Sequence, residues 1–254
     1  MARQRREKSE SGIYHIIWRG INRQIIFKDE EDLENFKQTL LRYKRTSGFS
    51  IFAYCLMSNH IHLLIKTGRE PIEQIMRRIG SSYVKSYNNK YDRVGHLFQD
   101  RYKSEPVDDE KYLLTVTRYI HQNPMKAKIC NDLSSYRWSS YLDYTNGGGI
   151  TDTNFILDIF DGNRKKALEN FILFSEQFNN DSCLEIDEDK RRISDELLEK
   201  VFEEKFKIKP DMLRKQPQDK IKAILKESLN IEGVSTRQLS KVTGISKNII
   251  WKLK

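Results

Sequence analysis

The sequence has few of the features that stabilise secreted or membrane-bound chains. It contains three cysteines, Cys55, Cys130 and Cys183, which are far apart and odd in number. Such a set argues against a disulfide framework or a paired-cysteine zinc site and favours a reducing compartment. No apolar run approaches the ~18–20 residues of a membrane span, and the basic N-terminus lacks the apolar stretch of a signal peptide. We therefore expect a cytoplasmic protein with no membrane partner.

The chain is nevertheless rich enough in apolar residues to fold. Hydrophobic residues make up 38% of the 254 residues and aromatic residues 11%, which excludes disorder throughout. The length exceeds that of one small module and suits either one domain with an appendage or two small domains.

The net charge of +9 is unevenly distributed along the chain. Residues 1–150 carry a net charge of +8 and residues 151–232 a net charge of −4. Residues 233–254 have five basic residues and no acidic ones. Two basic blocks around an acidic middle indicate two parts that face a polyanion. The alternative is a soluble basic protein without a nucleic-acid role.

Strand and helix signals alternate over the first 145 residues. Strands are expected at 13–18, 49–56, 60–65 and 102–107, and helices at 29–46, 71–87 and from 108 to a stop at Pro124. The order βαββαβ with a trailing helix predicts an α+β fold, a ferredoxin-like antiparallel sheet with helices on one face. Beyond it the strong segments are helical, at 155–160, 165–179, 194–206 and 219–228, followed by two short terminal helices.

The glycine run at 147–149 is the clearest linker signal. We therefore expect an α+β domain at 1–147, a helical region at 150–232 with no evident chemistry, and a segment at 233–254 that resembles a helix-turn-helix.

His60 and His62 lie in an apolar strand and form the first candidate site. At the strand period of two residues, both side chains point to the same face, close enough to share one metal ion. An HxH pair alone is a weak signal. A structural pair, with one core and one surface histidine, is an equal alternative.

Tyr119 and Asn123 form the second candidate site. They are i and i+4 on a helix, so they share a face, and the tyrosine could present a nucleophilic oxygen beside an amide ligand. The alternative is a core tyrosine followed by an Asn-Pro helix end.

These motifs occur together with others in a fixed order. They are Tyr14-His15-Ile16 with Arg19-Gly20, the stretch 54–64 containing His60-Ile61-His62, Gly95-His96-Leu97-Phe98 within 95–103, Tyr119-Ile120-His121-Gln122-Asn123-Pro124, and Trp138-Ser139-Ser140-Tyr141. In this order they resemble the IS200-like Y1 (HUH) transposases, and most closely the REP-associated tyrosine transposase branch. The resemblance covers about residues 10–145 and does not extend to 150–254.

The resemblance implies a DNA transposase that cleaves and rejoins single-stranded or hairpin DNA through a 5′-phosphotyrosine. His60 and His62 match the pair that holds a divalent ion, Mg²⁺ or Mn²⁺, and Tyr119 matches the catalytic tyrosine. Asn123 falls where relatives place an amide ligand, often glutamine. Relatives act as monomers or homodimers.

Two other functions stay open. A domesticated, non-catalytic regulator could recognise repeat hairpins. A metallohydrolase could use the HxH pair on a small substrate, although no carboxylate is spaced to complete its site.

Basic and aromatic residues across both basic blocks are the DNA-contact candidates. Those in the first block are Arg3, Arg5, Arg6, Arg19, Arg23, Arg77, Arg78, Lys85, Arg101, Tyr102 and Lys103. In the C-terminal segment, Ser235 or Thr236 caps a first helix, Gly244 lies in the turn, and Ser246, Lys247 and Asn248 begin the candidate recognition helix. Two short helices that simply complete a helical domain are the alternative.

Overall fold

A computed structural model describes residues 6–184, 193–231 and 233–253. The chain divides into two compact units, Met1–Glu185 and Ile186–Lys254. Among the described residues, no helix combines the length and the apolar character needed to cross a bilayer.

The first unit is built on a four-stranded antiparallel sheet with the strand order β2-β3-β1-β4. This is the ferredoxin-like order that the βαββαβ pattern predicts. Its elements are β1 (Ile13–Arg19), η1 (Ile21–Arg23), α1 (Glu30–Ser47), β2 (Ser50–Met57), β3 (His60–Lys66), α2 (Ile72–Lys90), β4 (Lys103–Pro106), α3 (Glu110–Lys126), α4 (Tyr141–Thr145), α5 (Thr153–Phe160) and α6 (Arg164–Glu176).

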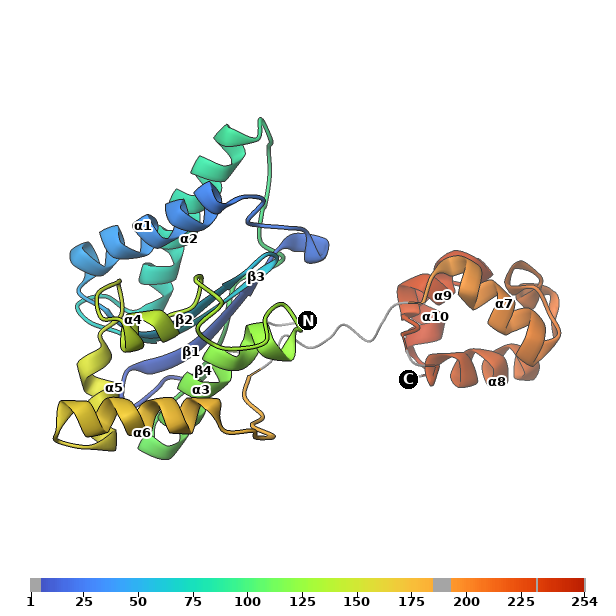
Figure 1. Ribbon diagram of the computed structural model, residues 1–254. Coiled ribbons are helices and arrows are strands. Elements are labelled where there is room, and N and C mark those ends of the chain that lie inside the picture. The colour runs from blue at the N-terminus through green and yellow to red at the C-terminus, as the bar shows by residue number, and fades with distance from the viewer. Residues whose placement is uncertain (1–5, 185–192, 232, 254) are drawn as a thin grey trace. The chain divides into compact units, whose positions relative to one another are not determined.

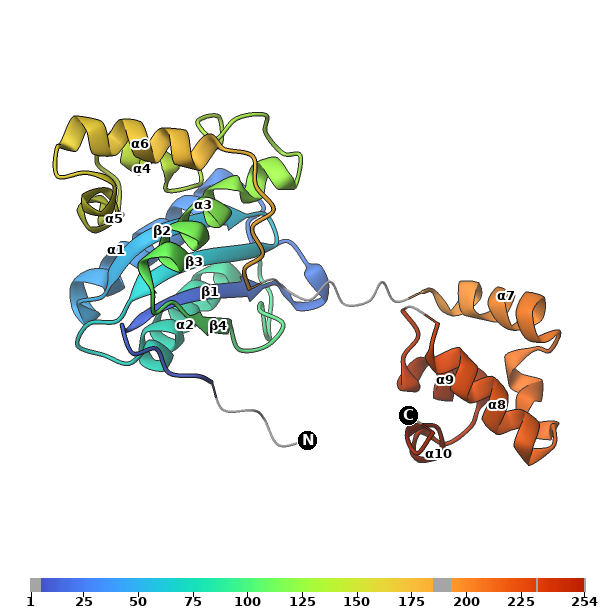
Figure 2. The ribbon, with the colours of Figure 1, turned by 90° about the horizontal axis from the view of Figure 1, so that it is seen from below.

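Helices cover both faces of this sheet, whereas the sequence pattern predicted helices on one face. Figure 1 shows α1 and α2 on one side of the strands and α3 with α6 on the other, and Figure 2 shows α3 lying across β2 and β3. The reason is that β2 is buried on both faces: Tyr54 and Leu56 pack with α1 and α2, while Ala53 and Cys55 pack with α3. A strand that is apolar on both sides needs cover on both sides.

Local signals set the ends of the helices. Asp29 caps α1 by accepting a hydrogen bond from the Asp32 backbone, and Gly48 ends α1 in a left-handed conformation. Asp109 caps α3 by accepting from the Tyr112 backbone. The helix runs through Pro124 to Lys126 instead of stopping at Pro124, because a proline in the last turn removes only one hydrogen bond.

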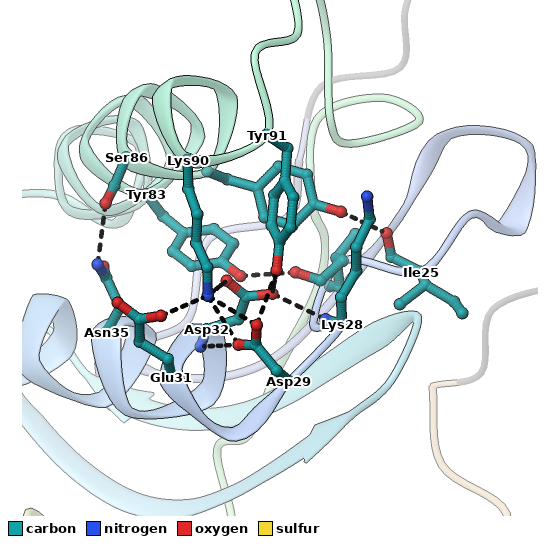
Figure 3. Close-up of polar contacts among 12 residues, drawn as sticks. Ile25, Lys28, Asp29, Glu31, Asp32, Asn35, Tyr83, Ser86, Lys90 and Tyr91 are labelled. Carbon is teal, nitrogen blue, oxygen red and sulfur yellow. Dashed lines mark hydrogen bonds and ion pairs between the residues drawn. The ribbon is translucent and has the colours of Figure 1, made fainter.

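A polar cluster fastens the end of α2 to the start of α1 (Figure 3). The Lys90 ammonium contacts the carboxylates of Asp29, Glu31 and Asp32 at 2.8–3.1 Å. The Tyr91 hydroxyl donates to Asp32 at 2.9 Å. These contacts fix the α1–α2 layer on its side of the sheet, away from the two histidines.

The glycine run at 147–149 is a turn within the first unit, not the boundary between units. The Asp143 carboxylate accepts hydrogen bonds from the backbone of Ile150 and Thr151 after the run, and a Cβ atom on Gly149 would collide with that carboxylate. Downstream, Ile156, Leu157, Ala167 and Phe171 belong to the core that includes α3. Residues 150–184 therefore pack with the sheet, and the expected region 150–232 divides between the two units.

The second unit consists of helices around a small core of its own. The elements are α7 (Asp195–Phe206), η2 (Pro210–Lys215), α8 (Gln218–Leu229), α9 (Thr236–Thr243) and α10 (Lys247–Trp251). Leu198, Phe202, Leu225, Leu239 and Ile250 are fully buried together. The segment 233–254 thus completes this helical unit.

Candidate active site

His60 and His62 lie on the face of β3 that is covered by α3. Their ring centroids are 5.1 Å apart. His62 is buried and His60 is half-buried at the start of the strand. Burial, followed by the charge of Arg19, lowers the pKa of His60 to about 4. Burial, with smaller contributions from His60 and His15, holds the pKa of His62 well below its ordinary value. Both rings are therefore neutral near pH 7, the form that binds metals.

The outer nitrogens of these two rings are left for a ligand. His60 Nδ1 lies 2.7 Å from the Asn59 Oδ1 atom, which can only accept, so the ring proton is on Nδ1 and Nε2 carries the lone pair. His62 Nδ1 lies 3.3 Å from His15 Nε2. In both rings Nδ1 contacts a neighbouring side chain, and within residues 6–184 no hydrogen bond to Nε2 is found.

Tyr119 comes from α3 and packs over the histidines. Its ring centroid is 5.9 Å from that of His62 and 5.9 Å from that of His15. Asn123 lies one turn further along α3 and donates from Nδ2 to the Tyr119 carbonyl at 2.8 Å. This bond leaves the Asn123 Oδ1 atom as the amide's acceptor.

The donor set fits a divalent ion. In the described part of the chain, no three His, Cys, Asp or Glu side chains are grouped to hold a metal. A site here would consist of His60 Nε2, His62 Nε2 and Asn123 Oδ1, with phosphate or water oxygens in the remaining positions. Two imidazoles and an amide oxygen suit Mn²⁺, and Mg²⁺ with less preference.

Three residues near this site were not singled out by the sequence. His15 is fully buried on β1 between His62 and Glu105 of β4. Lys126 places its ammonium 4.7 Å from the centre of the Tyr119 ring, in a cation–π contact. Lys126 is i+7 from Tyr119, a spacing that would have indicated it. His15 and Glu105 depend on strand pairing, which no local pattern specifies.

The other polar residues of the tyrosine motif serve packing. His121 is buried with its Nε2 atom 2.7 Å from the Ser140 hydroxyl, and burial lowers its pKa to about 3. Gln122 donates to the backbone carbonyls of Ser175, in the last turn of α6, and of Gln177, directly after it. Neither side chain is therefore a ligand candidate.

The DNA-contact candidates of the first unit are spread over several environments. Arg3 and Arg5 lie outside the described residues. Arg19 is opposite His60 in the β1–β3 register and is half-buried. Arg78 is bound by the Glu70 carboxylate through two hydrogen bonds. Three of the others are exposed, namely Arg23, Arg77 and Lys85.

The remaining candidates line a cleft beside β4. Arg6, Arg101, Tyr102 and Lys103 contribute to this cleft of about 600 Å³. Tyr102 is buried at 6% exposure, with the Arg6 guanidinium 3.9 Å above its ring. Arg6 thus covers one face of the Tyr102 ring, and a DNA contact at Tyr102 stays a prediction.

In the second unit, α9 and α10 are two short helices joined through Gly244, where the sequence predicts a helix-turn-helix. Ser235 caps α9 through the Gln238 backbone, and Gly244 makes the turn with φ +68°. Ser246, Lys247 and Asn248 are exposed at the start of α10.

Comparisons with known proteins concern the first unit and its fold. Residues 8–123 match the family model described as "Transposase IS200 like". Among solved structures, a REP-associated tyrosine transposase bound to a REP hairpin matches at 17% identity and a TM-score of 0.50, over 61% of this chain and 96% of that one. A protein from Deinococcus radiodurans R1, provisionally assigned as a transposase, matches at 18% identity and a TM-score of 0.34, over 48% of this chain and 97% of its own. No curated protein matches the sequence.

Proposed function

Residues 8–123 belong to the IS200-like transposase family, and from this premise we propose that the protein cleaves and rejoins single-stranded DNA. The reaction proceeds through a 5′-phosphotyrosine on Tyr119, at sequences that contain a hairpin, and requires Mg²⁺ or Mn²⁺. One observation carries the proposal: the Tyr119 ring lies 5.9 Å from the His62 ring, and both His60 and His62 use Nδ1 for contacts with described side chains, so that Nε2 is the nitrogen proposed for a ligand.

The residues have distinct roles in this chemistry. His60, His62 and Asn123 would hold a divalent ion, which would supply polarisation of the scissile phosphate. The Tyr119 oxygen attacks phosphorus, so an O–P bond forms and the bond to the 3′-oxygen breaks, which leaves a 3′-OH. Lys126, whose ammonium lies over the Tyr119 ring, supplies a positive charge beside the attacking residue. Attack by another 3′-OH on the phosphotyrosine reverses the step and joins strands, so no ATP is consumed.

The charge of the first unit supports a single-stranded DNA substrate. Arg101 and Lys103 are exposed along the cleft beside β4, where phosphates can follow them. Arg19, opposite His60, is placed to meet the phosphate nearest the site. The hairpin held by the structurally similar REP-associated transposase supports a hairpin as the feature recognised.

The second unit supplies a separate DNA contact in this proposal. Ser246, Lys247 and Asn248 at the start of α10 contact duplex DNA in the manner of a recognition helix. The Lys247→Glu substitution should weaken duplex binding, measured by fluorescence anisotropy, and leave single-strand cleavage intact. Equal duplex affinity for wild type and variant would remove this role.

The cleavage proposal is tested by trapping the covalent product. The protein is incubated with labelled single-stranded hairpin DNA and Mn²⁺, then run on a denaturing gel. Wild type should give a protein–DNA adduct that EDTA abolishes, and Tyr119→Phe should give none. The matched control is Tyr43→Phe, which removes a hydroxyl from α1 on the opposite face of the sheet and should leave the adduct unchanged.

The same experiment separates the alternatives. An adduct that survives Tyr119→Phe would contradict the role of Tyr119. Hairpin binding without any adduct from the wild type would instead indicate the non-catalytic regulator.

A further inference from the structure

Three polar side chains form a row across the sheet, from β4 through β1 to β3. Glu105 pairs with His15 in the β1–β4 register, and its Oε2 atom is 3.8 Å from His15 Nδ1. On the other side of the ring, His15 Nε2 is 3.3 Å from His62 Nδ1. The His15 and His62 rings are stacked with 22° between their planes. A fully buried imidazole thus connects a carboxylate to a proposed metal ligand.

Glu105 determines which ring nitrogen of each histidine in this row carries the proton, because both of its carboxylate oxygens accept hydrogen bonds. The Tyr112 hydroxyl donates to Oε1 at 2.5 Å and the Leu184 backbone N–H donates to Oε2 at 2.9 Å. Burial alone would raise the pKa of Glu105, but the nearby His15 ring and the hydrogen bonds from Tyr112 and Leu184 hold it below its ordinary value. Glu105 is therefore a carboxylate near pH 7.

The carboxylate selects the tautomers of both histidines. The distance of 3.8 Å between His15 Nδ1 and Glu105 Oε2 is too long for a hydrogen bond but short enough for an electrostatic interaction. His15 Nδ1 has no hydrogen-bond partner among the described residues. The negative charge beside Nδ1 favours the proton on that nitrogen. His15 Nε2 then accepts from His62 Nδ1, and His62 keeps its lone pair on Nε2, the atom that faces the site.

We infer that His15 and Glu105 are positioning residues that fix the tautomer and the ring orientation of His62 for divalent-metal binding. The inference rests on the proposed function, because it concerns the same site. Outer-shell partners of a ligating histidine typically contribute about 10–100-fold to metal affinity.

The segment after α6 contributes to this arrangement. The backbone of Leu184 holds Glu105, and two hydrogen bonds from Arg118 to Asp181 tie the same segment to α3. This segment lies in the region 150–232, for which the sequence predicts no chemistry, and it holds the Glu105 carboxylate in place.

The test compares Mn²⁺ affinity in variants of the full chain. His15→Phe keeps a ring but removes the acceptor, and Glu105→Gln removes the charge at a partly exposed position on the edge strand. Both should raise the Mn²⁺ dissociation constant about 10–100-fold, measured by the loss of the free-Mn²⁺ signal in electron paramagnetic resonance. His15→Gln keeps an acceptor oxygen and should recover part of the affinity. His121→Phe, the same change at a buried histidine outside the row, should leave it unchanged.

A second measurement reads the tautomer directly. Long-range ¹H–¹⁵N NMR of the histidine rings should show His62 protonated on Nδ1 in the wild type and a mixture of tautomers in Glu105→Gln. Wild-type Mn²⁺ affinity and an unchanged His62 tautomer in both variants would overturn the inference and leave the proposed function standing. A wild type that binds no Mn²⁺ would overturn the proposed metal chemistry and this inference with it.

Discussion

Phe171 tests whether α6 is part of the core of the first unit or a spacer beside it. The side chain is 1% exposed and stacks on Tyr144 at a centroid distance of 4.3 Å, with its edge toward His121 of α3. Truncation of a buried phenylalanine to alanine typically costs about 3–5 kcal/mol. We expect Phe171→Ala to destabilise the first unit by about 4 kcal/mol, a large part of the ~5–15 kcal/mol that stabilises a typical domain.

The matched control is Leu173→Ala, two residues further along α6. Leu173 is 63% exposed, so its truncation should change the free energy of unfolding by about 0.5 kcal/mol or less. The two substitutions remove apolar groups from one helix and differ mainly in what those groups contact.

The assay is urea unfolding followed by tryptophan fluorescence in a Trp251→Phe background. Trp251 is exposed in the second unit, so its replacement leaves Trp18 and Trp138 as reporters of the first unit. At about 2 kcal/mol per molar urea, Phe171→Ala should lower the midpoint by about 2 M. A midpoint for Phe171→Ala equal to that of Leu173→Ala would show that α6 does not stabilise the sheet domain, and would refute the reasoning.

Three further predictions concern the site, the core and the second unit. Asn123→Ala should weaken Mn²⁺ binding, because it removes one of three proposed donors; unchanged affinity in the same Mn²⁺ titration would exclude the amide as a ligand. Burial lowers the pKa of His121 to about 3, so the stability from its neutral ring is complete above pH 6.5 and is lost as pH falls toward 3. In the wild type, His121 should make the free energy of unfolding fall by about 1.4 kcal/mol per pH unit below pH 6.5. The His121→Gln substitution should remove this dependence, measured by urea unfolding at pH 5 and pH 7. An equal pH dependence in the two proteins would contradict the assignment. Gly244→Ala should destabilise the second unit by about 1 kcal/mol, measured by amide hydrogen exchange, because φ is +68° while the space for a Cβ is open; unchanged protection would argue against strain at this turn.

Local periodicity accounts for what the sequence predicted correctly. The two-residue period of β3 placed His60 and His62 on one face, and the helical period of α3 placed Tyr119 and Asn123 together. Both residues of each pair lie in a single strand or helix, so the spacing within that element was enough to predict that they share a face. The alternating strand and helix signals likewise indicated the ferredoxin-like order of the sheet.

Features that depend on pairing between distant elements were not predictable in this way. His15 and Glu105 become neighbours only when β1 pairs with β4, a register that their sequence separation does not reveal. The glycine run before Ile150 has the composition of a linker, and only the contacts with the Asp143 carboxylate show it to be a packed turn.

Mass spectrometry of the trapped complex tests the central claim most directly. The wild-type protein is incubated with single-stranded hairpin DNA and Mn²⁺, digested with nuclease and protease, and searched for peptides that carry a nucleotide. We predict a 5′-phosphate ester on the peptide that contains Tyr119, at the oxygen of that residue. A nucleotide linked to any other residue, or none on wild-type protein that binds the hairpin, would contradict the account.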